Sequence, residues 1–422
     1  MKLKEHLDAV KAAADGMRVG FLSTFPPTEC GIATFTEDLV NAIDRLPLAP
    51  RTQVIAINVD GTQKDYEPRV SLQVDQERLE DYYRIADHVN DSAISVLSLQ
   101  HEFGIFGGEM GSHLIALLGA VRKPVVTTLH TLLSRPSDQM RAILQEIVRR
   151  SEGLVVMNSS ASHLLVEQYG ADPARIRLIH HGTPDFSGRS PKRIKQRLGL
   201  EGRTIIATFG LISRSKGLEY AVEAMAMVAR RHPEALYLIL GQTHPVVRRR
   251  EGEVYREALE AAIDNYGLHD QVRFVNHYLT KAQLIDYLVA TDIYLTPYLA
   301  RNQLCSGALA YAAGAGKAIV STPYWYALDI LCGGRGMIVD FRDPRGIADA
   351  CNLLLDCPAL RRTLAARTTR LGRRMPWHYV AGEYVAAFRQ AVRAGAASRV
   401  TRVAPEVRPA RSGVVAVGKK PV

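Results

Sequence analysis

The segment TPYLARNQLCSGALAYAAGAGKAIVSTPYWYALDI, from Thr296 to Ile330, decides the fold that this sequence predicts. A short apolar run from Asp292 to Leu295 precedes it and predicts a buried strand. The chain then passes through Ser306 and Gly307 into a helix of very small side chains, and a second strand follows from Ala318 to Ser321. At such a helix start, free backbone N–H groups can bind an anion or a sugar hydroxyl. Close packing of the helix on a sheet is the alternative explanation for its small residues.

The same alternation of apolar strands and amphipathic helices runs through most of the chain. It predicts two parallel, doubly wound sheets, because alternating strands and helices form right-handed crossover units. In the first half, strands are expected at residues 17–23, 53–58, 94–99, 125–129, 154–157 and 176–179. In the second half, strands are expected at residues 204–209, 236–240, 272–275, 293–295, 318–320 and 337–339.

The break between the two halves falls at a polar, proline-containing segment from Pro184 to Pro191. A chain of 422 residues is too long for one ordinary hydrophobic core, which supports two domains. The predicted organisation is an N-terminal extension (1–16), an N-terminal Rossmann-like domain (17–190), a C-terminal Rossmann-like domain (191–375), a closing helix (376–396) and a basic tail (397–422).

The composition describes a basic chain without a disulfide framework. The 53 Lys and Arg residues against 43 Asp and Glu give a net charge of +10, which favours anionic ligands. Part of this excess lies in the tail, which is expected to be disordered, with a weak tether to anionic lipid or nucleic acid as the functional alternative. The five cysteines form no CxxC pair, and no apolar stretch reaches membrane-spanning length. We therefore expect a cytoplasmic protein, with peripheral contact to the inner face of the membrane at most and no nucleic-acid partner.

Polar residues gather at the carboxyl ends of the predicted strands in both halves. In the first half these include His101, His130 and the pair His180 and His181. Because the carboxyl ends of parallel strands meet at one edge of a sheet, we expect a single cleft between the domains. Zinc is not favoured, since no ligand pair has the spacing of an HExxH motif, and no metal or cofactor is expected. Lys216 follows a strand and a turn at a helix start, where it suits a phosphate or simply solvent.

Five motifs occur together, namely PPTECGIATF (26–35), TLH (128–130), GLISRSKG (210–217), LILG (238–241) and GAGKAIVST (314–322). In two tandem Rossmann-like domains, this combination resembles the retaining glycosyltransferases of the GT-B fold, glycosyltransferase family four, over about residues 17–396. The resemblance implies metal-independent transfer of a sugar from a nucleotide-sugar donor. Transfer would take place in the cleft between an acceptor-binding N-terminal domain and a donor-binding C-terminal domain. The last helix would cross back to the N-terminal domain.

The resemblance also implies roles for individual residues. His130 matches the active-site histidine, Gly31 the glycine near the donor phosphate and Lys216 the phosphate-binding lysine. The expected catalytic set is His130, Lys216 and Gln303. The expected donor-binding set is Gly31, Gly210, Arg214, Lys216, His244, Gln303, Ser306, Gly307 and Tyr311. The expected acceptor-binding set is His101, Glu102 and His181.

Three positions depart from the family pattern. Gln303 and Tyr311 stand where the family has the two glutamates of its E-x7-E signature, and Leu211 stands where it has the arginine of the diphosphate clamp. Gln303 can still donate to and accept from sugar hydroxyls, whereas Tyr311 offers one weaker bond or a stacking face in place of a carboxylate. Arg214 or Arg248 can replace the missing cation.

The sequence therefore predicts transfer of a hexosyl group from a nucleotide sugar to a sugar, glycan or lipid-linked acceptor. One alternative is a glycoside phosphorylase that uses a sugar 1-phosphate and inorganic phosphate, with phosphate ligands from residues 243–257. The other is a sugar-binding protein without catalysis. The feature that separates them is whether His130, Lys216 and Gln303 face one cleft with room for a sugar.

Overall fold

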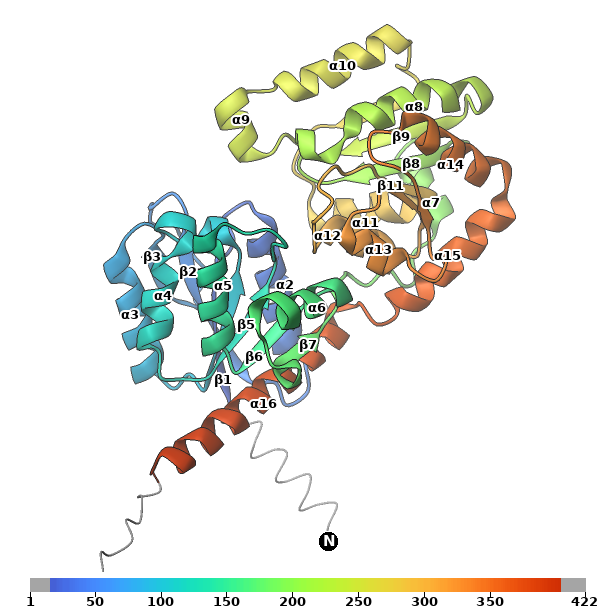
Figure 1. The fold of residues 1–422 in the computed structure, drawn as a ribbon. Helices are drawn as coiled ribbons and strands as arrows, with labels where there is room; N and C mark the ends of the chain where they lie inside the picture. Colours follow the sequence, from blue (N-terminus) through green and yellow to red (C-terminus); the bar gives the residue numbers. More distant parts are fainter. Residues whose placement is uncertain (1–15, 404–422) are drawn as a thin grey trace, which may run out of the picture.

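The computed structural model describes residues 16–403 and, within that range, side chains as far as residue 396. Figure 1 shows two α/β lobes, and the chain crosses to the second lobe before residue 191 and returns after residue 372. The expectations for the N-terminal extension and for residues 404–422 of the tail, including its membrane tether, lie outside the described residues.

The N-terminal lobe is built on a seven-stranded parallel sheet in the order β3-β2-β1-β4-β5-β6-β7. Its strands are β1 (Arg18–Ser23), β2 (Arg51–Asn58), β3 (Val70–Asp75), β4 (Val96–His101), β5 (Val125–Leu129), β6 (Gly153–Val156) and β7 (Ile176–Leu178). Its helices are α2 (Gly31–Asp44), α3 (Leu79–Asp91), α4 (His113–Ala120), α5 (Asp138–Arg150) and α6 (Ser159–Tyr169), with short 3-10 turns η1 (Phe103–Ile105), η2 (Glu109–Gly111) and η3 (Pro173–Arg175).

The C-terminal lobe has a six-stranded parallel sheet in the order β10-β9-β8-β11-β12-β13. Its strands are β8 (Thr204–Phe209), β9 (Ala235–Leu240), β10 (Val272–Val275), β11 (Ile293–Thr296), β12 (Ala318–Ser321) and β13 (Met337–Ile338). Its helical segments are α7 (Pro191–Arg197), η4 (Arg214–Lys216), α8 (Leu218–Arg231), α9 (Pro245–Glu251), α10 (Val254–Tyr266), α11 (Lys281–Ala290), α12 (Gly307–Gly314), α13 (Trp325–Leu331), α14 (Pro344–Asp356) and α15 (Pro358–Gly372).

Both sheets reverse their strand order at one point, between β1 and β4 in the first lobe and between β8 and β11 in the second. Ligands of open parallel sheets bind beyond the carboxyl ends of the strands at such points. The loops that follow these four strands line the same cavity between the lobes. The topology therefore places both reversal points at one site.

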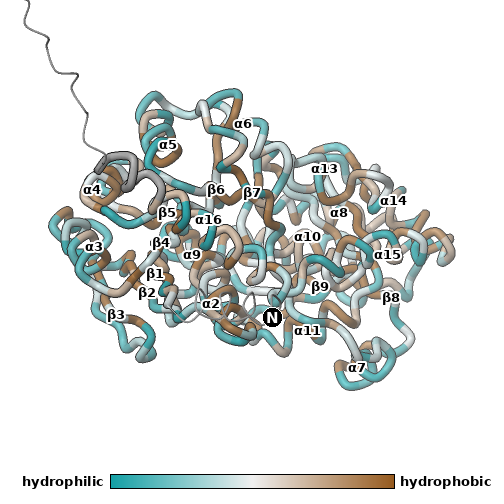
Figure 2. Tube along the Cα trace, turned by 90° about the horizontal axis from the view of Figure 1, so that it is seen from below, coloured by the Kyte–Doolittle hydropathy of each residue, from teal (hydrophilic) through white to brown (hydrophobic). Residues whose placement is uncertain are grey.

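Apolar residues on both faces of the central strands form the core. Every residue of β4, β5, β9 and β12 is buried, as expected of central parallel strands that are covered on both faces. The surrounding helices alternate between hydrophobic and hydrophilic residues in Figure 2, as expected of helices with one buried face. The largest cluster of buried apolar residues contains members from both lobes, so the lobes share one connected core.

The closing helix α16 (Trp377–Val403) crosses back to the first lobe and packs on α2 and on β4, β5 and β6. At its start, the backbone N–H of Thr183 donates to Met375 (2.7 Å) and that of Trp377 donates to Thr183 (3.0 Å). The helix continues past residue 396 to Val403, so the first residues assigned to the tail are helical.

The predicted fold class, two doubly wound α/β domains, is confirmed. All twelve expected strands are present, with ends that differ by at most two residues. The strand that the sequence did not reveal is β3, which lies at the edge of its sheet and buries only Val74. An edge strand with one buried residue carries too weak an apolar pattern to be recognised.

Candidate active site

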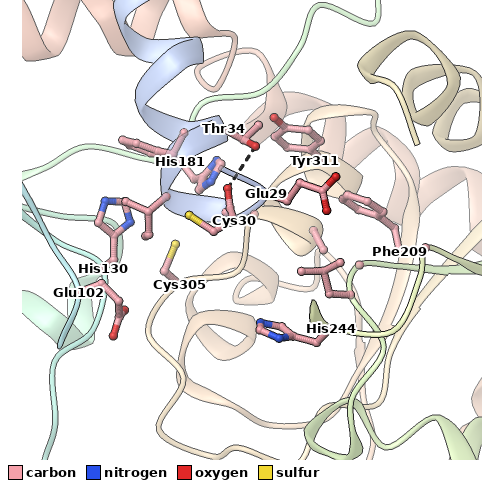
Figure 3. Close-up of a pocket in the computed structure, with 18 of the residues that line it drawn as sticks. Glu29, Cys30, Thr34, Glu102, His130, His181, Phe209, His244, Cys305 and Tyr311 are labelled. Atoms are coloured by element: carbon pink, nitrogen blue, oxygen red, sulfur yellow. Dashed lines mark hydrogen bonds between the residues drawn. The ribbon is translucent and has the colours of Figure 1, made fainter. Parts of the chain in front are cut away.

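A cavity of about 850 Å³ lies between the two lobes and is lined by residues from both. This volume falls within the range of roughly 300–1,000 Å³ that is usual for small-molecule sites. The residues predicted from the sequence that line it are Gly31, Glu102, His130, His181, Gly210, Lys216, His244, Gln303, Gly307 and Tyr311. Figure 3 shows His130 and Glu102 on one side of this cavity and Phe209 and Tyr311 on the other.

The amino-terminal end of α2 forms one wall. Cys30 caps this helix, and its sulfur accepts a hydrogen bond from the N–H of Ala33 at 3.3 Å. A Cβ added to Gly31 would meet no atom within 4 Å, so space is open beside the first turn. Free N–H groups at a helix start favour an anion or a hydroxyl oxygen, and Gly31 leaves them accessible.

His130 follows β5 and is held in one orientation. Its Nε2 lies 2.9 Å from Oε1 of Gln100, whose amide nitrogen donates to Ser98 (3.1 Å) and Thr128 (3.4 Å). The Gln100 oxygen therefore accepts from Nε2–H, and Nδ1 is left as an acceptor. Burial lowers the pKa of His130 to about 3, aided by the nearby His181 and His101. His130 is consequently a neutral ring at physiological pH and offers a hydrogen-bond acceptor rather than a charge.

Glu102 follows β4 and is the carboxylate beside His130 in Figure 3. It accepts hydrogen bonds from the Phe103 N–H (3.1 Å) and the Thr131 hydroxyl (2.5 Å). Burial raises the pKa of Glu102, while these two hydrogen bonds oppose that shift. Both bonds are donated to the carboxylate, which positions it as an acceptor at the edge of the cavity.

His181 of the N-terminal lobe contacts the start of α12 in the C-terminal lobe. Its Nδ1 bonds the carbonyl of Gly182 at 2.7 Å, and its ring lies edge-on to Phe35 with centroids 5.1 Å apart. A Cβ added to Gly307 would lie 3.0 Å from Nε2 of His181. The glycine at this position therefore permits the close approach of the two lobes.

Gly210 and Gly241, which follow β8 and β9, line the cavity on the side of the C-terminal lobe. Gly241 has a φ of +129°, and a Cβ there would lie 2.4 Å from the carbonyl oxygen of Gly210. Only glycine fits this approach and this conformation. Since both residues line the cavity, the two loops expose backbone where a phosphate or sugar can come close.

Lys216, in η4, supplies a cation to the same side. Its ammonium lies over the ring of Tyr298, 3.8 Å from the centroid, and it forms no ion pair with any described carboxylate. Burial lowers the pKa of Lys216 to about 8. A partly buried cation without an anionic partner gains from a ligand that supplies the anion, so this side chain favours a phosphate-bearing ligand.

Gln303 occupies the loop before α12. Its Nε2 donates to the carbonyl of Cys305 at 2.9 Å, which fixes the amide and leaves Oε1 as the group that can accept from a ligand. The Gln303 side chain therefore both stabilises the loop before α12, through its hydrogen bond to Cys305, and lines the cavity.

Tyr311 of α12 joins a cross-lobe cluster. Its hydroxyl donates to Asp38 of α2 at 3.1 Å, and Lys281 of α11 forms an ion pair with the same carboxylate. The Tyr311 ring stacks on Phe209 with centroids 6.4 Å apart. The position of the second family glutamate is therefore occupied by a residue whose hydroxyl is bonded to the opposite lobe and whose ring lines the cavity.

Three of the predicted site residues, His101, Arg214 and Ser306, do not line the cavity. His101 is 1% exposed and packs against Phe103 and Phe106, because its side chain leaves β4 on the side opposite to Glu102. Arg214 points outward over the Tyr255 ring, with its Nε 3.8 Å from Glu251. Ser306 is used as the cap of α12, where its hydroxyl accepts from Leu309.

Other lining residues were missed by the sequence reasoning. They are charged or polar side chains that were not assigned a role from the sequence: Glu29, Glu37, Gln242, Tyr278 and Lys281. Glu29 lies inside the recognised PPTECGIATF motif, and Gln242 directly follows the recognised strand-end glycine, so those two signals were available. Lys281 begins α11 and carried no signal, since its importance comes from its pairing with Asp38. Among residues 16–396, no group of three or more His, Cys, Asp or Glu side chains could hold a metal ion.

Two Rossmann-like lobes with a cavity between their strand ends define the GT-B class of glycosyltransferase folds. Family models agree: residues 31–185 match Glycosyltransferase Family 4 and residues 191–371 match Glycosyl transferases group 1. The chain belongs to glycosyltransferase family four, as the resemblance indicated.

Among curated relatives, a D-inositol 3-phosphate glycosyltransferase of Nocardioides is 25% identical over 291 residues, which are 64% of this chain and 62% of the relative. The enzyme of that name from Rhodococcus jostii is 27% identical over 64% of this chain and 61% of its own length. The matched region thus spans about three fifths of these relatives. No helix among the described residues is long and apolar enough to cross a membrane.

Among solved structures, sucrose-phosphate synthase from Thermosynechococcus elongatus has a TM-score of 0.72 at 18% identity, and covers 90% of this chain and 100% of its own. HepE of Anabaena, solved with UDP and glucose, has a TM-score of 0.69 at 14% identity, covering 87% of this chain and 98% of its own. At these identities the likeness shows the fold.

Proposed function

We propose that this protein is a retaining, metal-independent glycosyltransferase that moves a hexosyl group from a nucleotide-sugar donor to a sugar, glycan or lipid-linked acceptor. The observation that carries this proposal is the ammonium of Lys216, which is partly buried over the Tyr298 ring, pairs with no described carboxylate and lines the same cavity as His130 and Gln303. The diphosphate of a nucleotide sugar supplies the missing anion. Structures solved with UDP on this fold make UDP the first nucleotide to test.

In this mechanism, the charge that develops on the departing phosphate is stabilised by Lys216 and by free N–H groups of the glycine loops. His130 accepts a sugar hydroxyl at Nδ1, and Gln303 accepts another at Oε1. Arg214 points outward, towards Glu251 and the Tyr255 ring, so we assign this role to Lys216, which lines the cavity.

Two observations favour this function over its alternatives. The arginines at 248–250, which a phosphorylase would use as phosphate ligands, are exposed and do not line the cavity. Apolar side chains filling the space between His130, Lys216 and Gln303 would have favoured a sugar-binding protein without catalysis. These three residues instead line one open cavity of about 850 Å³.

The test is calorimetric titration of the protein with UDP, GDP and inorganic phosphate, followed by assay of sugar transfer from the matching nucleotide sugars. We expect a nucleoside diphosphate to bind and Lys216→Met to weaken it by about tenfold or more. The acceptor panel includes D-inositol 3-phosphate, for which the curated relatives are named. Binding of phosphate with no nucleotide binding would favour the phosphorylase instead.

A further inference from the structure

The cavity has opposite charges on its two sides. On the N-terminal side, three glutamates line it, and we call Glu29, Glu37 and Glu102 the acidic wall. None of the described lining residues of the N-terminal lobe is a lysine or an arginine. Both lining lysines, Lys216 and Lys281, belong to the C-terminal lobe, and the charge of Lys281 is already paired with Asp38.

The acidic wall consists of acceptors for hydroxyl protons. Glu102 receives its two protein hydrogen bonds from Thr131 and Phe103, and a carboxylate has room for further donors. Glu29 receives one from the Gln242 amide at 3.4 Å, across the cleft. Burial is the main cause that raises the pKa of Glu37 and of Glu102, and at Glu37 the charges of Lys281 and Arg69 oppose it. A further negative charge would therefore be screened least beside Glu102.

We propose that the N-terminal side of the cavity binds an acceptor sugar that carries no phosphate or carboxylate group, with Glu102 accepting one of its hydroxyls. This inference rests on the proposed function, because it assigns the acceptor of the same site. Sugar hydroxyls form charge-assisted hydrogen bonds with carboxylates, whereas a phosphorylated acceptor would set a like charge against the acidic wall. The anionic groups of the substrates are thereby confined to the donor side, where Lys216 lies.

The test is saturation-transfer NMR of UDP-loaded protein with two matched pairs of compounds: glucose with glucose 6-phosphate, and myo-inositol with D-inositol 3-phosphate. In the wild type, we expect the uncharged member of a pair to bind at least about tenfold more tightly. Glu102→Gln should weaken the uncharged member and reduce this preference to about threefold or less. Glu37→Gln is a second variant that reduces the preference without depending on the folding of the first. Glu167→Gln, which changes the net charge equally on the exposed face of α6, is the control and should leave the preference unchanged.

Equal or tighter binding of the phosphorylated members, binding of no member, or a preference that neither cavity variant alters would overturn the proposal. UDP affinity is measured by calorimetry in every variant. If UDP does not bind to the wild type, the proposed function fails; if UDP binds and the phosphorylated sugar is preferred, only the acceptor inference fails.

Discussion

Lys216 is a lysine that titrates within the range in which enzymes are assayed. Its pKa, lowered to about 8 by burial, means that the ammonium is charged below pH 8 and becomes neutral above it. Attraction for the donor diphosphate is therefore present at neutral pH and is lost as the pH rises through about 8. We expect kcat/KM for the donor, which reports the free enzyme, to fall above that pH.

The same pH profile in Lys216→Arg is the control, because a guanidinium stays charged throughout and should remove this fall. Circular dichroism at each pH checks that the fold persists. A wild-type kcat/KM that stays constant to about pH 10, the range of an unperturbed lysine, would contradict the assignment of Lys216 to the phosphate.

Gln303 has a divided role that a substitution can expose. Its amide nitrogen holds the carbonyl of Cys305, and its oxygen is left for the sugar. Gln303→Ala should weaken sugar-nucleotide binding by about 1–3 kcal/mol relative to the wild type, since sugar hydroxyls lose a partner. Free UDP has no sugar at this position, so its affinity should change much less. Calorimetry with UDP-glucose and UDP measures both, and an equal loss for the two ligands would argue for a collapsed loop.

At the scale of elements, α2, α11 and α12 are tied together by Tyr311, Asp38 and Lys281. Asp38 is 6% exposed, so each hydrogen bond to its carboxylate is protected from water. Tyr311→Phe removes one of these bonds and should lower the free energy of unfolding by about 1–3 kcal/mol. Tyr266→Phe, at a tyrosine that is 48% exposed on α10, is the matched control and should have little effect. Denaturant unfolding followed by fluorescence provides the measurement.

Tyr311→Glu restores the family carboxylate in the sequence but places it beside Asp38 in the structure. Two close carboxylates repel, so we expect a larger loss of stability than in Tyr311→Phe. Asp38→Asn in the same chain should relieve part of that loss. If Tyr311→Glu is as stable as the wild type, the hydrogen bond between Tyr311 and Asp38 does not contribute to the free energy of unfolding.

At the scale of the whole molecule, the two lobes supply complementary chemistry. The C-terminal lobe contributes Lys216, and we assign it the stabilisation that metal-dependent enzymes obtain from a divalent ion. We therefore expect the rate of sugar transfer in EDTA to equal the rate in Mg²⁺ or Mn²⁺. A loss of turnover in EDTA that either ion restores would show that Lys216 does not suffice.

The strands and the helix starts follow from the sequence because they depend on neighbours in the chain. Apolar runs predicted twelve strands, and the glycine loops after β1, β8 and β9 were identified with the cavity-lining residues Gly31, Gly210 and His244. The family resemblance then located His130 and Gln303 at the same site.

Side-chain direction and long-range pairing were decided by the tertiary structure. His101 and Glu102 are adjacent in the sequence, yet one is enclosed by aromatic rings and the other lines the cavity, because successive side chains of extended backbone point to opposite sides. Tyr311 meets Asp38, 273 positions away in the chain. Such a contact depends on how the lobes face each other, and that is fixed by the shared core and the return of α16, so no local pattern at Tyr311 can encode its partner.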